Sequence, residues 1–246
     1  MINKITAKIK KKLAHGPSHD GQNLRDLILG GQDGLVNVMG IVLGVASATS
    51  DVQVVVIAGL VATFAESISM AAVAYTSMQA ERAYYESIVE KEKRDMKNVP
   101  HEEEAEVREI YYKMGFRGNL LDQIVAKITS NHELWLKVML SQELGLETKD
   151  MPDPIRSAFL VGFSAFIGSL IPMIPFFLFP TNIPLSIMLS VVMGVIVLFA
   201  AGAYKAKVTT GSWWKSGIEI AVVGTTAGIA GYLIGAWLGA NPLISG

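Results

Sequence analysis

The sequence predicts an all-α membrane protein with five transmembrane helices and a cytoplasmic helical bundle inserted between the second and the third. Three observations support this prediction. The chain of 246 residues is 51% hydrophobic and only 17% charged, which is too apolar for an ordinary soluble enzyme. It contains five apolar stretches, each near or above the roughly 20 residues that span a hydrocarbon core. Its charged residues gather outside these stretches, and many lie in residues 81–153.

The apolar stretches are expected to be helices, because only helices and closed barrels satisfy the backbone in lipid and these runs are too long for barrel strands. The first two are joined by a few residues around Asp51 and should form a helical hairpin. The third contains Pro172 and Pro175, which remove backbone donors and favour a kink or a broken end. The five stretches are residues 27–49, 53–79, 156–179, 184–204 and 214–239.

The stretches divide the chain into four parts. Residues 1–23 are a basic N-terminal segment, 24–80 hold the first two transmembrane helices, 81–153 form a cytoplasmic metal-binding helical domain, and 154–246 hold the last three helices. Lysine and arginine cluster on one side of this arrangement only, so the N-terminus and the insert should face the cytoplasm and the C-terminus should lie outside. The brevity of the chain favours a plasma membrane over an organelle.

Two acidic residues lie inside the first two apolar stretches, Asp33 in QDGLV and Glu66 in AESISM. Ionisable residues are costly in a bilayer and by default mark an ion pathway, a proton relay or a buried pair. Asn37 follows Asp33 by one helical turn, and Met70 follows Glu66 by one turn. Two facing helices could thus bring Asp33, Glu66 and Met70 to a cation crossing the membrane. The alternative is that Asp33 caps a helix near the interface, that Glu66 is protonated and hydrogen-bonded, and that Met70 only packs.

The insert carries further acidic residues at helical spacing. Members of each pair are three or four residues apart, so both can project from one side of a helix. Carboxylates bind hard or borderline divalent cations, and a methionine shifts the preference towards softer transition metals. The alternative is a solvated acidic face with interspersed lysines. The pairs are Glu92 with Asp95, Glu103 with Glu106, and Met139 with Glu143.

Several function classes lose support from the composition. Cysteine is absent, which removes disulfides, thiolate zinc sites and cysteine nucleophiles. A membrane-tethered ferritin-like oxidase needs Glu-x-x-His pairs, and neither His101 nor His132 has a glutamate three residues before it. No nucleotide-binding glycine-lysine motif is present either. We therefore expect no enzyme, no cofactor and no nucleic-acid partner. A magnesium or calcium transporter would keep the carboxylates but would have little use for Met70 and Met139.

Several stretches of the chain resemble, in order, the vacuolar iron transporter family of ferrous iron and manganese exporters. They are DLILGGQDGLVNVMGIVLGVASA, ESISMAAVAYTSMQAER, EEEAEVREIYYKMGF, and VMLSQELGLE ahead of SAFLVGFSAFIGSLIPMIPFF. The resemblance covers about residues 24–240. It implies a five-helix membrane domain, a cytoplasmic metal-binding domain, and a homodimer with its translocation path between subunits. It also implies proton-coupled antiport that exports ferrous iron, with manganese as a second cargo, from the cytosol.

The resemblance also implies roles for particular residues. Asp33 matches the family's membrane aspartate, proposed to bind metal and proton, and Met70 matches its membrane methionine. The cytoplasmic ligands of the family fall at Glu92, Asp95, Glu103, Glu106, Met139 and Glu143. The chain also departs from the family.

Plant members carry a glutamate where this chain has Ala62, and we infer that Glu66 reaches a similar face. Asp95 replaces a glutamate, and Leu140 stands where a second methionine often follows the first.

These observations lead to one functional hypothesis and one alternative. The insert would gather a divalent cation, and the membrane carboxylates would exchange protons for it, so that inward proton movement drives metal out of the cytosol. Asp33 would alternate between a metal-bound and a protonated state. The alternative is a membrane-anchored divalent-metal sensor or buffer that binds metal without moving it. The choice between iron and manganese and the number of protons stay open at this point.

Overall fold

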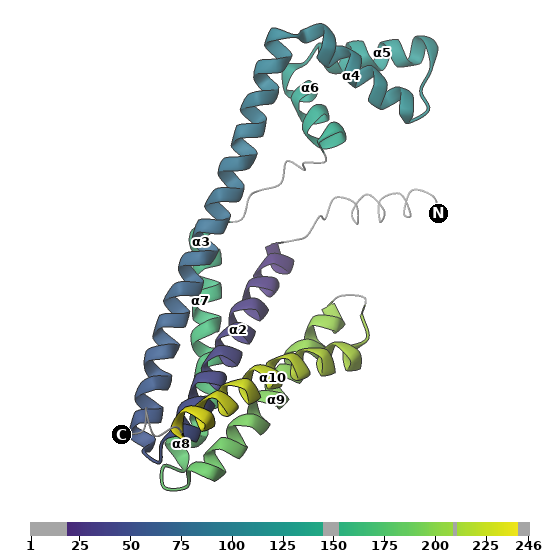
Figure 1. Ribbon diagram of the computed structural model, residues 1–246. Coiled ribbons are helices and arrows are strands. Elements are labelled where there is room, and N and C mark those ends of the chain that lie inside the picture. The colour runs from purple at the N-terminus through teal and green to yellow at the C-terminus, as the bar shows by residue number, and fades with distance from the viewer. Residues whose placement is uncertain (1–18, 145–152, 209–210, 241–246) are drawn as a thin grey trace. The chain divides into compact units, whose positions relative to one another are not determined.

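The computed structural model describes residues 19–144, 153–208 and 211–240, and the regular elements among them are all helices (Figure 1). The chain folds as two compact units. We call Met1–Thr76 together with Pro152–Gly246 the apolar unit, and Ser77–Met151 the insert unit. Most of the basic N-terminal segment lies outside the described residues.

Within the described residues, five helical spans are long and apolar enough to cross a membrane. They confirm the expected all-helical protein with five long apolar helices. The spans lie in α2 (His19–Ala48), in α3 (Val52–Asn98), in α7 (Pro154–Leu170) with its continuation, in α9 (Ile183–Val208) and in α10 (Trp213–Gly239).

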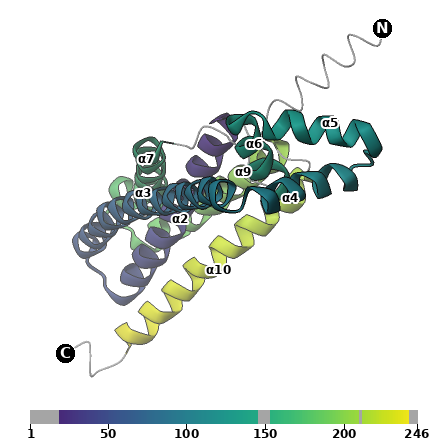
Figure 2. The ribbon, with the colours of Figure 1, turned by 90° about the horizontal axis from the view of Figure 1, so that it is seen from above.

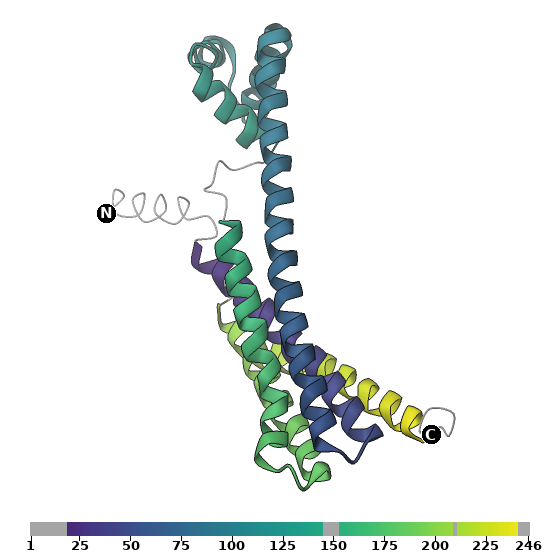
Figure 3. The same ribbon diagram turned by 90° about the vertical axis from the view of Figure 1, so that its left-hand side faces the viewer.

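Helix α3 is much longer than a bilayer requires. It has 47 residues in one unbroken helix (Figure 3). At 1.5 Å per residue such a helix is about 70 Å long, more than twice the roughly 30 Å of a hydrocarbon core. Its first part belongs to the apolar unit, and its polar second part, which begins at Ser77, belongs to the insert unit. One helix therefore carries both apolar and polar sequence.

Glycines let α2 pack closely against two neighbours, α7 and α10. A Cβ atom at Gly34 would collide with the carbonyl oxygen of Ala165 in α7, and one at Gly235 in α10 would collide with the carbonyl oxygen of Gly44. Small residues at such crossings are the usual means of close helix contact in membranes, where lipid gives no hydrophobic driving force between helices. This packing fixes α2, and with it Asp33, in the apolar unit.

The third apolar stretch is broken where its prolines lie. α7 is followed by a 3₁₀ turn, η2 (Ile171–Met173), and by the short helix α8 (Ile174–Leu178). Two buried serines of α9 bond to carbonyls of the broken segment: the Ser190 hydroxyl donates to the oxygen of Pro172 at 2.8 Å, and that of Ser186 to the oxygen of Pro175 at 3.1 Å. The Ser190 bond gives a donor to a backbone carbonyl that has no water available, whereas the Pro175 oxygen also accepts from the Phe179 N–H at 2.9 Å.

The insert unit has its own hydrophobic core. It is built from the end of α3, α4 (Pro100–Lys113), α5 (Gly118–Thr129), α6 (His132–Val138) and the π-helical turn η1 (Met139–Glu143), and successive helices pack on one another (Figure 2). Pro100 opens α4, where its missing N–H is no loss, and the Asn131 side chain caps α6 by accepting from the Leu134 N–H. The core consists of Met96, Val107, Leu121, Val125, Ile128, Trp135, Val138 and Met139.

Candidate metal sites

The two acidic residues of the apolar unit meet. Asp33 of α2 and Glu66 of α3 are in side-chain hydrogen-bonding contact, and the Asn37 amide Nδ2 donates to Glu66 Oε1 at 3.0 Å. Asp33 lies in the middle of α2, which rules out the alternative that it caps a helix end. Two carboxyls in such contact need either a proton or a cation between them, since two like charges repel each other at this range. The geometry therefore suits an exchange of one for the other.

Other polar groups lie close to this pair. Met70 follows Glu66 by one turn on α3 and is half-buried. One turn before Glu66, the buried Thr63 hydroxyl donates to the Gly59 oxygen at 2.8 Å and lies 3.6 Å from the sulfur of Met173. Sequence reasoning missed the Thr63–Met173 contact, because it depends on the break in the third apolar stretch that turns Met173 towards α3. The spacing of Asn37 from Asp33, one helical turn, indicated in the sequence that this amide would lie near the acidic pair.

The acidic pair lies at an open face of the apolar unit. Asn37 is exposed, and Asp33 and Glu66 are only partly buried. Beside them a groove of about 500 Å³ runs between α2 and α10, and its lining includes Asn37, Gly40, Gly44, Gly231 and Gly235. Amide and carboxyl groups at bilayer depth are costly against lipid and almost always face protein or water. We therefore expect this face to contact protein or water and not lipid.

In the insert unit the acidic residues meet in pairs. Glu92 of α3 and Glu103 of α4 are each only 7% exposed and share a hydrogen bond, and Glu106 bonds in the same way to Glu143 at the end of η1. One oxygen of each buried carboxyl, Glu92 Oε1 and Glu103 Oε2, has no hydrogen-bond partner. Asp95 adds its charge to the same neighbourhood.

Burial and mutual repulsion favour the protonated forms of these carboxyls. Burial, followed by the charge of Glu92 and the hydrogen bond to it, raises the pKa of Glu103 to about 7. Burial raises the pKa of Glu92, and burial with the charge of Glu106 raises the pKa of Glu143. A divalent cation would remove the repulsion and displace the protons, so metal binding here would depend on pH.

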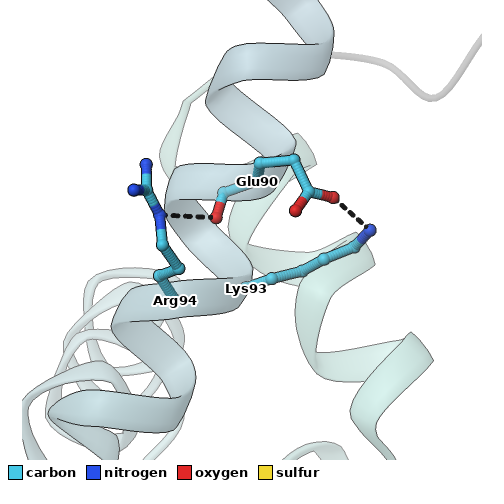
Figure 4. A network of polar contacts seen from close by, with 3 residues as sticks. All are labelled: Glu90, Lys93 and Arg94. Atoms are coloured by element: carbon cyan, nitrogen blue, oxygen red, sulfur yellow. Dashed lines mark hydrogen bonds and ion pairs between the residues drawn. The ribbon is translucent and has the colours of Figure 1, made fainter.

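The alternative of a solvated acidic face applies to other glutamates of the same helices. Glu90 pairs with Lys93 at 2.7 Å, and Arg94 donates to the Glu90 backbone oxygen (Figure 4). Glu109 pairs with Lys113 at 2.7 Å. These lysines lower the pKa of Glu90 and of Glu109. The helices thus separate lysine-paired glutamates in water from the buried Glu92 and Glu103.

The cage of carboxylates with a thioether that the spacing predicts stays a prediction. Among the residues that the structure describes, no group of three or more histidine, aspartate or glutamate side chains could hold a metal ion. Met139 is wholly buried in the apolar core of the insert unit. Met139 begins a π-helical turn, closed by the Leu144 N–H on the Met139 oxygen at 3.2 Å, so Met139 and Glu143 do not project as a pair on one side of an α-helix would.

Comparison with known proteins identifies the family. The VIT family matches residues 24–236. The chain belongs to the VIT family. It is 30% identical to "Vacuolar iron transporter 1" of Arabidopsis thaliana over 87% of this chain and 85% of the relative. It is also 30% identical to the protein of the same name from Oryza sativa subsp. japonica, over 86% of this chain and 84% of the relative. The "Vacuolar iron transporter" of Plasmodium falciparum is 27% identical over 92% and 87%.

These findings bear on four of the expectations. The resemblance to the vacuolar iron transporter family is confirmed, as is the expectation of a multi-pass membrane protein. Membership of a transporter family agrees with the expectation that the chain is not an enzyme. The preference for a plasma membrane over an organelle is wrong, because the relatives are named for the vacuole, which is an organelle. Chain length carries no information about the host membrane, which is why that argument failed.

Proposed function

We propose that this VIT-family chain is a secondary active transporter that moves ferrous iron from the cytosol into a vacuole-type organelle in exchange for protons. Manganese is the second candidate cargo. The observation that carries the proposal is the contact of two carboxyls, Asp33 and Glu66, inside a unit whose helices are long and apolar enough to span a membrane. The relatives' names, which state iron transport for those proteins, support the choice of metal.

The acidic pair gives the proposed exchange its chemistry. In a low-dielectric surrounding, a proton on the Asp33–Glu66 pair removes the repulsion between the carboxyls, and so does a divalent cation bound to both. The two states exclude each other, so each metal ion that enters displaces a proton. Met70, one turn from Glu66, would add a thioether, which favours a transition metal over magnesium or calcium.

The insert unit would collect the metal on the cytoplasmic side. The lysines and arginines at the start of the chain, and the lysines at the end of α9 and the start of α10, support this orientation. The carboxyls of Glu92 and Glu103, with Asp95, Glu106 and Glu143 nearby, would draw together around a cation and lose their shared protons. The π-helical turn that carries Met139 and Glu143 is a geometry frequent at functional sites.

A homodimer would cover the open face of the apolar unit with protein. Asn37 is exposed and Glu66 is partly exposed on this face, next to a groove whose lining includes glycines of α2 and α10. A second copy seated here would shield the polar groups from lipid and would place two acidic pairs on one path between subunits.

Transport assays with two matched variants test the proposal. Purified protein in liposomes should accumulate ferrous iron only when a proton gradient is imposed, with protons moving in the opposite direction. Asp33→Asn should abolish the flux, whereas Glu219→Gln, which changes an exposed acidic residue of α10, should leave it within about twofold. Metal binding by the wild-type protein without any flux would favour the sensor or buffer instead.

A further inference from the structure

Asn37 holds one particular oxygen of Glu66. Its Nδ2 donates to Glu66 Oε1 at 3.0 Å across the gap between α2 and α3. The amide nitrogen is a donor only, so it cannot itself bind a cation. It occupies Oε1 and leaves Oε2 as the oxygen of Glu66 that a cation can use most easily.

This contact matters because divalent cations differ in the number of oxygens they need. Calcium takes six to eight oxygen ligands and often binds both oxygens of one carboxylate, whereas smaller transition-metal ions take fewer ligands and accept nitrogen or sulfur. A carboxylate with one oxygen already bonded to an amide binds a cation more readily through its other oxygen. It therefore suits a small ion better than calcium.

We propose that Asn37 is a positioning residue that sets metal selectivity: by holding one oxygen of Glu66, it limits Glu66 to single-oxygen coordination and disfavours calcium. This inference rests on the proposed function, since it takes the Asp33–Glu66 pair as the membrane metal site. It assigns a role to a side chain that acts through Glu66 and does not itself contact the ion.

The chain offers a matched control on the same helix. Gln32 is also an amide of α2, but it lines a separate cavity of about 410 Å³ between α2, α7 and α9. Replacing Gln32 with leucine removes an amide from α2 without touching the bond to Glu66. Asn37→Leu removes the bond but keeps a side chain that branches at Cγ, and Asn37→Gln keeps an amide donor.

The experiment measures manganese uptake into liposomes under a proton gradient, with calcium as the competitor. Asn37→Leu should strengthen inhibition by calcium, relative to the apparent affinity for manganese, by about tenfold, the scale of one hydrogen bond to a charged group. Gln32→Leu should leave this ratio unchanged, and Asn37→Gln should restore part of it. In a Glu66→Ala background, where calcium–manganese competition for binding to the solubilised chain replaces uptake as the readout, Asn37→Leu should have no further effect, because Asn37 acts through Glu66.

Two results would overturn the inference: an unchanged calcium ratio in Asn37→Leu, or the same change in the Glu66→Ala background, which would make Asn37 a ligand in its own right.

A binding measurement separates this failure from a failure of the proposed transport. Calcium and manganese compete for the solubilised full chain carrying Glu92→Gln and Glu103→Gln, so that the membrane site is read without flux. If the wild type moves no metal but Asn37→Leu still changes this competition, transport fails and the role of Asn37 stands. Manganese binding that does not require Asp33 counts against both the proposed transport site and the role of Asn37.

Discussion

The buried carboxyl of Glu103 should link metal binding by the insert unit to pH near neutrality. Burial and the neighbouring Glu92 raise its pKa to about 7. At pH 8 about nine in ten such carboxyls are ionised, and at pH 6 about one in ten, whereas a carboxyl of ordinary pKa is ionised at both. Because a cation must displace this proton, the affinity for metal should fall about tenfold from pH 8 to pH 6 through Glu103 alone.

Replacing Glu103 isolates this contribution. In Glu103→Gln the affinity for manganese should be weaker at pH 8, and the decrease from pH 8 to pH 6 should be about tenfold smaller than in the wild type. The measurement is calorimetric titration of the solubilised full chain with manganese at pH 6, 7 and 8, in an Asp33→Asn background that silences the membrane site. Glu109→Gln is the control, because Glu109 lies on the same helix, is exposed and pairs with Lys113.

The same shift has a consequence for the metal-free protein. The pKa of Glu103 is higher in the folded state than its usual 4.5, so its protonated form stabilises the fold. This stabilisation is complete below about pH 4.5 and is lost as the pH rises through about 7. The insert unit should lose up to about 3 kcal/mol of stability between pH 4.5 and pH 8 through Glu103.

A pH dependence of metal affinity that is identical in the wild type and in Glu103→Gln would refute the link between Glu103 and metal binding.

Three further predictions follow from the described contacts. Ser190→Ala should lower the stability of the apolar unit by about 1–3 kcal/mol, because it leaves the Pro172 carbonyl without its buried donor, and thermal unfolding in detergent measures this against Thr226→Val, an exposed hydroxyl of α10. Glu66→Gln should abolish proton-driven metal flux while the protein stays folded by size-exclusion chromatography, and retained flux would contradict the paired site. Asn131→Ala should lower the stability of the insert unit by about 1 kcal/mol, because it removes the N-terminal cap of α6. Hydrogen exchange at the Leu134 N–H should become faster, and unchanged exchange would argue against the cap.

The membrane-spanning helices could be predicted from the sequence because their signal is simple. A run of about 20 apolar residues has few other stable forms in lipid, and a proline inside such a run must disturb the backbone ladder. Pro172 and Pro175 accordingly mark the break between α7 and α8. The contact of Asp33 with Glu66 could also be predicted from the sequence, because a short loop forces the first two helices to lie together.

Tertiary detail lay beyond the same reasoning. Spacing places Glu90, Glu92, Glu103 and Glu109 on helices with equal plausibility, yet two of them are buried and two pair with lysines in water. The difference arises from which helix face packs on the core of the insert unit, and no local pattern reports that.

Met139 illustrates the same limit. Its spacing from Glu143 assumes an α-helix, and the chain makes a π-helical turn there instead. The hydrogen bonds from the serines of α9 to the broken segment could not be predicted either, because they form only once α8 lies against α9.

The most direct test of the account is simultaneous measurement of ferrous iron and proton movement in liposomes that contain the purified chain. The account predicts that iron moves only with an imposed proton gradient, that protons move in the opposite direction, and that Asp33→Asn stops both movements together. Iron flux that continues unchanged in Asp33→Asn, or that proceeds without any proton movement, would contradict the claim that the Asp33–Glu66 pair exchanges metal for protons.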